Sequence, residues 1–215
     1  MNRAFPTSAR VFFSMALGAL AIAVAPALFD RFSAADVPAM WWAGRATGLL
    51  AYLALWLSAL FGVLVSGRGA GGLLDRAVVL QLHTRWSVAA LVATTLHVLL
   101  IVADKHSGVS PLAAIVPLAS DKLRGPIALG TLALWGMATI GVTTALFKHL
   151  PRWLWRATHA AAFGTFVLAL IHSVSAGSET TLSLVRGIYA GTAAIFVGAV
   201  IQRVLIAWHQ ARARQ

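Results

Sequence analysis

Long uncharged apolar stretches alternate with short polar segments along most of the chain. A stretch of about 18 or more such residues is long enough to cross a membrane as a helix. The pattern predicts six membrane-spanning helices joined by short loops, over residues 11–29, 46–66, 77–103, 126–147, 157–175 and 182–208. The third of these contains one charge, Arg85, and the sixth contains Arg186 and Arg203 toward its ends. The expected fold is an all-α integral membrane bundle that forms one domain over residues 1–215.

Composition points to the same class of protein. Hydrophobic residues make up 60% of the chain and charged residues only 11%, against roughly 25% charged residues in an ordinary soluble domain. The mean hydropathy is +0.83. A soluble core in a chain of 215 residues cannot bury this much apolar surface. The chain also has no cysteine, which excludes disulfides and thiolate ligands.

The net charge of +11 is distributed in a way that predicts orientation in a membrane. The basic residues lie in short segments between apolar stretches, without the fold signature of a nucleic-acid binder, so no nucleic-acid partner is expected. With a cytoplasmic N-terminus, the cytoplasmic side holds 11 of the 17 Lys and Arg residues and one of the six acidic residues. The positive-inside rule therefore predicts that both termini are cytoplasmic. The first apolar stretch, 11–29, has a second interpretation as a signal peptide, although it is rather long for that role.

Four histidines lie inside the predicted spans, where ionisable groups are costly and usually functional. His83 and His97 are fourteen positions apart on the third helix, and His159 and His172 are thirteen positions apart on the fifth. Each separation is roughly 20 Å along a helix, so each helix offers one histidine near each membrane face. Because both helices run in the same direction, His83 should lie level with His159, and His97 level with His172.

Two histidines that face each other at one level can bind a haem iron from both sides. Two such levels predict two stacked haems between the third and fifth helices. A lone membrane histidine often only hydrogen-bonds to a neighbouring helix, but four that match in depth favour ligation. The other three histidines, His106, His149 and His209, lie in loops or at span ends, where an interfacial role is expected.

Helical phase agrees with this arrangement on one helix only. Fourteen steps of about 100° bring His83 and His97 onto one face. Thirteen steps leave His159 and His172 about 140° apart on an ideal helix. The fifth helix therefore needs a bulge, a kink or supercoiling, which Gly164 would permit, or else the two haems lie off a common axis.

Haem propionates require cations nearby. Arg85, two residues after His83, is predicted to pair with one haem, with snorkelling to the membrane surface as the alternative. Arg45 is predicted to serve the other haem, and the loop cations Lys122 and Arg124 are further candidates.

The spacing patterns His-x13-His at His83 and His97 and His-x12-His at His159 and His172 resemble the ferric reductase-like transmembrane domain superfamily. That superfamily includes ferric reductases and NADPH oxidases. The segment 42–48, Trp-Ala-Gly-Arg-Ala-Thr-Gly, is similar to the start of the second helix in small bacterial members. The resemblance implies two haem b groups with bis-histidine ligation and electron transfer across a bacterial inner membrane.

The resemblance also implies partners. Larger members carry a flavin and nicotinamide domain after the last helix, and we expect this chain to bind neither cofactor alone. Electrons would come from a separate flavin reductase or from membrane quinol. They would leave to ferric iron, oxygen or a periplasmic acceptor protein.

Two alternatives remain at this stage. In the first, the chain is a single-haem membrane subunit of a periplasmic reductase, such as the methionine sulfoxide reductase system. In the second, it is a haem-free membrane scaffold or small transporter. The spans contain no Asp or Glu, which counts against a carboxylate-based ion pathway.

Overall fold

The computed structural model describes residues 39–66 and 75–212, and every regular element in those ranges is a helix. The elements are α2 (Ala39–Ser66), α3 (Arg76–Ala103), α4 (Pro111–Ile115), α5 (Arg124–Ala145), α6 (Arg152–Ala160), α7 (Ala162–Ala176), the 3₁₀ helix η2 (Ser178–Thr181) and α8 (Ser183–Arg212). The predicted span at 11–29 lies outside the described residues. The all-α prediction is confirmed for the rest.

Five helical stretches are long and apolar enough to cross a membrane, and α6 and α7 together form one of them. They are Met40–Ser66, Arg76–Ala103, Arg124–Ala145, Arg152–Ala176 and Ser183–His209. Their outward faces carry many exposed Leu, Val and Ile side chains, a surface suited to lipid rather than water. These features indicate a membrane protein.

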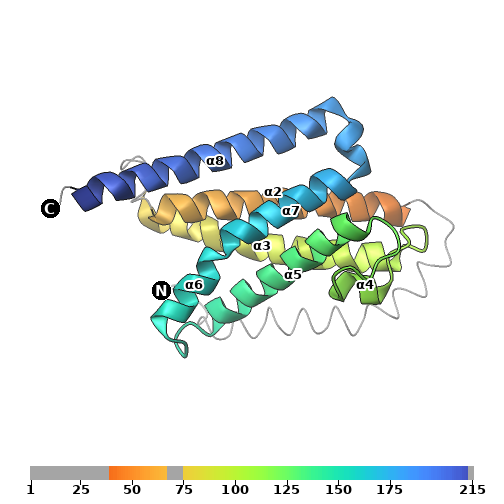
Figure 1. Ribbon diagram of the computed structural model, residues 1–215, viewed down its shortest axis with the longest axis horizontal. Coiled ribbons are helices and arrows are strands. Elements are labelled where there is room, and N and C mark those ends of the chain that lie inside the picture. The colour runs from red at the N-terminus through yellow and green to blue at the C-terminus, as the bar shows by residue number, and fades with distance from the viewer. Residues whose placement is uncertain (1–38, 67–74, 213–215) are drawn as a thin grey trace, which may run out of the picture.

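The long helices lie side by side along the long axis of the molecule (Figure 1). α2 and α3 form the most extensive helix pair, and α5 packs mainly against α7. Tyr52 on α2 and Phe166 on α7 are 2% and 1% exposed, with stacked rings 5.9 Å apart. The Tyr52 hydroxyl also lies 2.6 Å from Thr192 Oγ1 on α8, so this cluster fastens α2, α7 and α8 together.

Several predicted boundaries were wrong. α2 begins at Ala39 rather than at 46, because the charged Arg45 finds acceptors on a neighbouring segment and does not interrupt the helix. The predicted span 126–147 is α5, Arg124–Ala145, which ends in a turn ahead of Pro151. The membrane-compatible stretch of α8, Ser183–His209, agrees with the predicted span 182–208, and the helix itself continues to Arg212. The short α4 and η2 were not predicted.

The span predicted over 157–175 is two helices, with a break at Ala161. Ala161 has a ψ of −11°, against about −42° in an α-helix. Its N–H is shared between the carbonyls of Ala157 and Thr158, at 3.2 Å each. This tightened turn changes the helical phase between His159 and His172, as their spacing requires. It lies at Ala161 and not at Gly164.

Candidate histidine-pair site

The four histidines of the spans form two pairs in space. The ring centres of His83 and His159 are 5.9 Å apart, with an angle of 80° between the ring planes. Those of His97 and His172 are 6.4 Å apart, with an angle of 67°. The pairing by level that the sequence predicted is therefore the pairing in the structure.

His97 is held by two features of α2. Its Nδ1 lies 2.7 Å from the carbonyl oxygen of Gly44. Since a carbonyl oxygen only accepts, Nδ1 carries the proton and Nε2 keeps a free lone pair. The ring also lies against Gly48, where an added Cβ would come within 2.9 Å of its Cε1 and Nδ1.

The same arrangement recurs at two other histidines. His83 donates from Nδ1 to the carbonyl of Ser58 at 2.8 Å, and its Cε1 would lie 3.3 Å from a Cβ at Gly62. His172 donates to the carbonyl of Pro126 on α5 at 2.8 Å. We call each unit, a carbonyl and the glycine four residues after it, a carbonyl–glycine clasp.

Helix geometry explains why the clasp needs glycine. A helical side chain leans toward the N-terminus and covers the turn before its own Cα. The residue four positions after a carbonyl therefore shields that oxygen unless it has no side chain. The two clasps of α2 begin at Gly44 and Ser58, which have the same sequence separation as His83 and His97 on the antiparallel α3.

His159 differs from the other three histidines. Its Nδ1 is buried and has no hydrogen-bond partner in the part of the chain that the structure describes. Its ring stacks on Trp155, one turn earlier on α6, with ring centres 5.1 Å apart and planes 21° apart. It therefore has an aromatic support and no carbonyl–glycine clasp.

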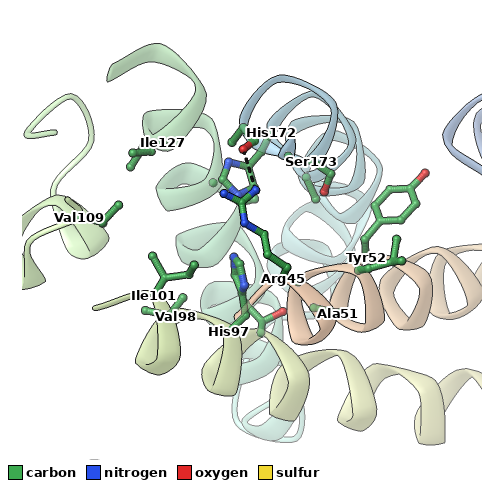
Figure 2. A pocket seen from close by; sticks show the side chains of 18 of the residues that line it. Arg45, Ala51, Tyr52, His97, Val98, Ile101, Val109, Ile127, His172 and Ser173 are labelled. Atoms are coloured by element: carbon green, nitrogen blue, oxygen red, sulfur yellow. Dashed lines mark hydrogen bonds between the residues drawn. The ribbon is translucent and has the colours of Figure 1, made fainter. Parts of the chain in front are cut away.

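A cavity of about 620 Å³ lies between His97 and His172. Its wall is mainly apolar, with Tyr52, Leu55, Val98, Ile101, Leu134 and Met137 among the lining residues. Figure 2 shows Arg45 extending from α2 into the space between α3 and α7 that also holds the rings of His97 and His172. A volume of this size lies in the range of about 300–1,000 Å³ that cofactor sites occupy.

Arg45 lines this cavity and has a hydrogen-bond donor without a partner among the described residues. Its Nη1 lies 3.3 Å from the carbonyl of Ala176 and 3.5 Å from Oε2 of Glu179, and its guanidinium lies 3.9 Å from the Trp41 ring centre. Its Nε is buried without a partner among the described residues. An unpartnered donor in an apolar cavity suits an anionic group of a bound molecule.

The other predicted cations are placed differently. Arg85 is exposed on α3, about 200° around the helix from His83, so the structure does not bring it to the histidine pair. Its role at a propionate remains a prediction, and its position suits snorkelling. Lys122 lines the cavity, whereas Arg124 donates from Nε to the carbonyl of Leu118 at 2.9 Å.

The donor set fits haem better than a bare metal ion. No three His, Cys, Asp or Glu residues gather within residues 39–66 and 75–212, and a bare-ion site takes three or four protein ligands. Haem iron takes only two. With about 2 Å from metal to imidazole nitrogen and about 1 Å from nitrogen to ring centre, two axial imidazoles place their ring centres roughly 6 Å apart. Both pairs have this separation.

A family model matches the chain over residues 39–179, and its description is "Domain of unknown function (DUF8596)". The match covers more than half of the chain. The chain belongs to this family. No curated protein and no solved structure matches it. The DUF8596 region includes both histidine pairs, all three clasps and Arg45, and it ends at Glu179, while α8 follows it.

Sequence reasoning missed the supporting groups within the DUF8596 region. Gly62 and Gly130 were not singled out, and Gly48 entered only as part of the segment 42–48. Neither Trp155 nor Glu179 was linked to the histidines. One signal was present in the sequence, because Gly48 and Gly62 have the same separation as His83 and His97. Glu179, the ion-pair partner of Arg45, gave no such signal, since its contact depends on where η2 lies relative to α2.

Proposed function

We propose that this protein carries electrons across a membrane through two haem b groups, one at each histidine pair. The observation that carries the proposal is the geometry of the imidazoles. Three of the four present a free Nε2 because Nδ1 donates to a backbone carbonyl. Metal-bound histidines use the same arrangement, which fixes the ring and raises its basicity.

When bound, haem supplies an iron that gains and loses one electron. The side chains of the protein supply the rest of the site. The histidine pairs would hold the iron, the apolar wall would exclude water, and Arg45 would bind a propionate carboxylate. The roughly 20 Å along α3 from His83 to His97 would place one site toward each face of the bilayer.

The charge distribution orients the two sites in the membrane. With both termini in the cytoplasm, the His83–His159 pair would lie toward the cytoplasmic side and the His97–His172 pair toward the outer side. Electrons would enter from a separate flavin reductase or from quinol. They would leave to ferric iron, oxygen or a periplasmic acceptor protein, as in the ferric reductase-like proteins that the sequence resembles.

The first test is haem content. The full-length protein, purified in detergent after expression with haem supplied, should show low-spin b-type spectra when oxidised and when reduced with dithionite. Two haems per chain are expected. One haem per chain would favour the single-haem subunit of a periplasmic reductase, and none would favour the scaffold or transporter.

Transfer across the membrane needs its own measurement. In sealed lipid vesicles with ferricyanide trapped inside, the protein should speed the oxidation of a membrane-impermeant reductant outside. Vesicles with the variant that lacks both His97 and His172 should show the background rate. Equal rates in both preparations would contradict transfer through the two sites.

Arg45 and Glu179 both line the cavity, and removing either charge should shift the midpoint potential of the haem at the His97–His172 pair. The two shifts should have opposite signs. A positive charge favours the reduced iron, so Arg45→Gln should lower the midpoint potential, and Glu179→Gln should raise it. A unit charge about 10 Å away at an effective dielectric of about 20 contributes roughly 1.7 kcal/mol, or about 70 mV for one electron. A redox titration followed by absorbance measures both midpoint potentials, with Arg152→Gln as the control, because Arg152 is exposed on α6 and does not line the cavity. Shifts of the same sign in the two cavity variants would contradict this placement.

A further inference from the structure

His159 has no clasp because of the residue at position 143 of α5, where a clasp would need glycine. The clasp of His172 uses the carbonyl of Pro126 and Gly130 on that helix. His159 precedes His172 by thirteen positions in the sequence, and α5 runs antiparallel to α6 and α7. The equivalent clasp for His159 therefore falls near 139 and 143, further along α5.

Threonines occupy both of these positions. Thr143 is half-buried, and its Oγ1 donates to the carbonyl of Thr139 at 2.7 Å. Threonine commonly bonds back to the carbonyl four residues earlier in this way. Thr158, next to His159, contacts Thr143 with 3.2 Å between their Oγ1 atoms, so this part of α5 does face α6. The carbonyl that would receive His159 is thus covered and already bonded.

The remaining support of His159 comes from its own short helix. Trp155, which stacks on it, is on α6 as well, so this contact does not tie His159 to another helix. The break at Ala161 separates α6 from α7, which carries the clasped His172. His83, on the other side of the pair, is fixed to α2 through Ser58 and Gly62.

We propose that His159 is a replaceable axial ligand, so that its iron binds a small neutral diatomic molecule. This inference rests on the proposed function, because it requires haem at the His83–His159 pair. With haem present, His159 would give up its place at the iron to the diatomic molecule, and His83 would stay bound. His97 and His172 both have clasps and would retain their iron.

Carbon monoxide added to the reduced full-length protein tests the inference. About one CO per two haems should bind. The variant with His97→Ala and His172→Ala retains only the His83–His159 pair and should still bind CO. The variant with His83→Ala and His159→Ala retains only the clasped pair and should not. In the wild type the association rate should level off at high CO, because release of His159 limits it.

A variant that gives His159 a carbonyl–glycine clasp tests the inference more sharply. Thr143→Gly uncovers the carbonyl of Thr139, and CO association should slow by about tenfold or more, the usual effect of a hydrogen bond to a metal-binding histidine. Thr144→Gly is the matched control, since Thr144 is exposed on the same helix, and its rate should equal that of the wild type. Equal rates in the two variants would overturn the inference.

The remaining outcomes separate the two proposals. Two haems of which neither binds CO, or CO bound only at the His97–His172 pair, would overturn the role of His159 and leave the proposed function standing. Absence of haem would overturn both.

Discussion

Replacing His97 and His172 together by Ala should reduce the haem content from two per chain to one. In the proposed function each pair would supply both protein ligands of one iron, so the double variant would lack the bonds that retain that haem in detergent. The double variant His83→Ala with His159→Ala should lose the other haem, and the quadruple variant both. The pyridine haemochrome assay, normalised to protein mass, measures the content directly.

The histidines outside the pairs provide the controls. His149 and His209 are exposed, and replacing either by Ala should leave two haems per chain. In the single-haem alternative, replacing His97 or His172 alone would leave the haem content unchanged. Two haems in the His97, His172 double variant would show that these residues are not ligands, and the proposed function would then fail.

The histidine pairing was predictable because it depends on local quantities. Apolar length gives the spans, and a fixed rise per residue gives the depth of each histidine. The predicted span 77–103 agrees closely with α3, Arg76–Ala103. The spacing of His159 and His172 predicted an irregularity between them, and the break at Ala161 confirms it. Its position was missed because neither proline nor glycine marks it.

The groups that support the histidines were less predictable, because they belong to other helices. A clasp requires that a particular carbonyl of α2 or α5 faces a particular ring, which depends on how those helices are aligned against α3 and α7. Glu179 was not linked to the site from the sequence, yet its Oε2 lies 3.5 Å from Nη1 of Arg45. Arg85, chosen for its closeness to His83 in sequence, is on another face of α3. Two positions along a helix turn a side chain by about 200°, so closeness in sequence was the wrong criterion for Arg85.

Substituting Gly130 by Ala should release the haem at the His97–His172 pair, although Gly130 itself is not a ligand. An added Cβ there would lie 2.6 Å from Cε1 and 2.7 Å from Nδ1 of His172. The ring would have to move away from α5, which breaks the 2.8 Å bond from its Nδ1 to the carbonyl of Pro126. Overpacking of this kind costs about 1–3 kcal/mol. Haem content should fall toward one per chain.

Gly141 offers a matched control on the same helix. A Cβ at Gly141 would meet only Leu91 Cδ1, at an ordinary contact distance of 3.7 Å, so Gly141→Ala should retain both haems. Haem content and the low-spin spectrum after purification distinguish the two variants. If they behave alike, the clasp at Gly130 does not position His172.

Substituting each of the three clasp glycines by Ala should cause haem losses that follow a fixed order. The closest approach of an added Cβ to the ring is 2.6 Å at Gly130, 2.9 Å at Gly48 and 3.3 Å at Gly62. Haem loss on substitution by Ala should follow this order, since a shorter contact forces a larger shift of the ring. At Gly62 a shift of a few tenths of an ångström suffices, and His83 should retain most of its haem. An order that ignored these distances would indicate that Ala acts by changing helix packing in general rather than by displacing the imidazoles.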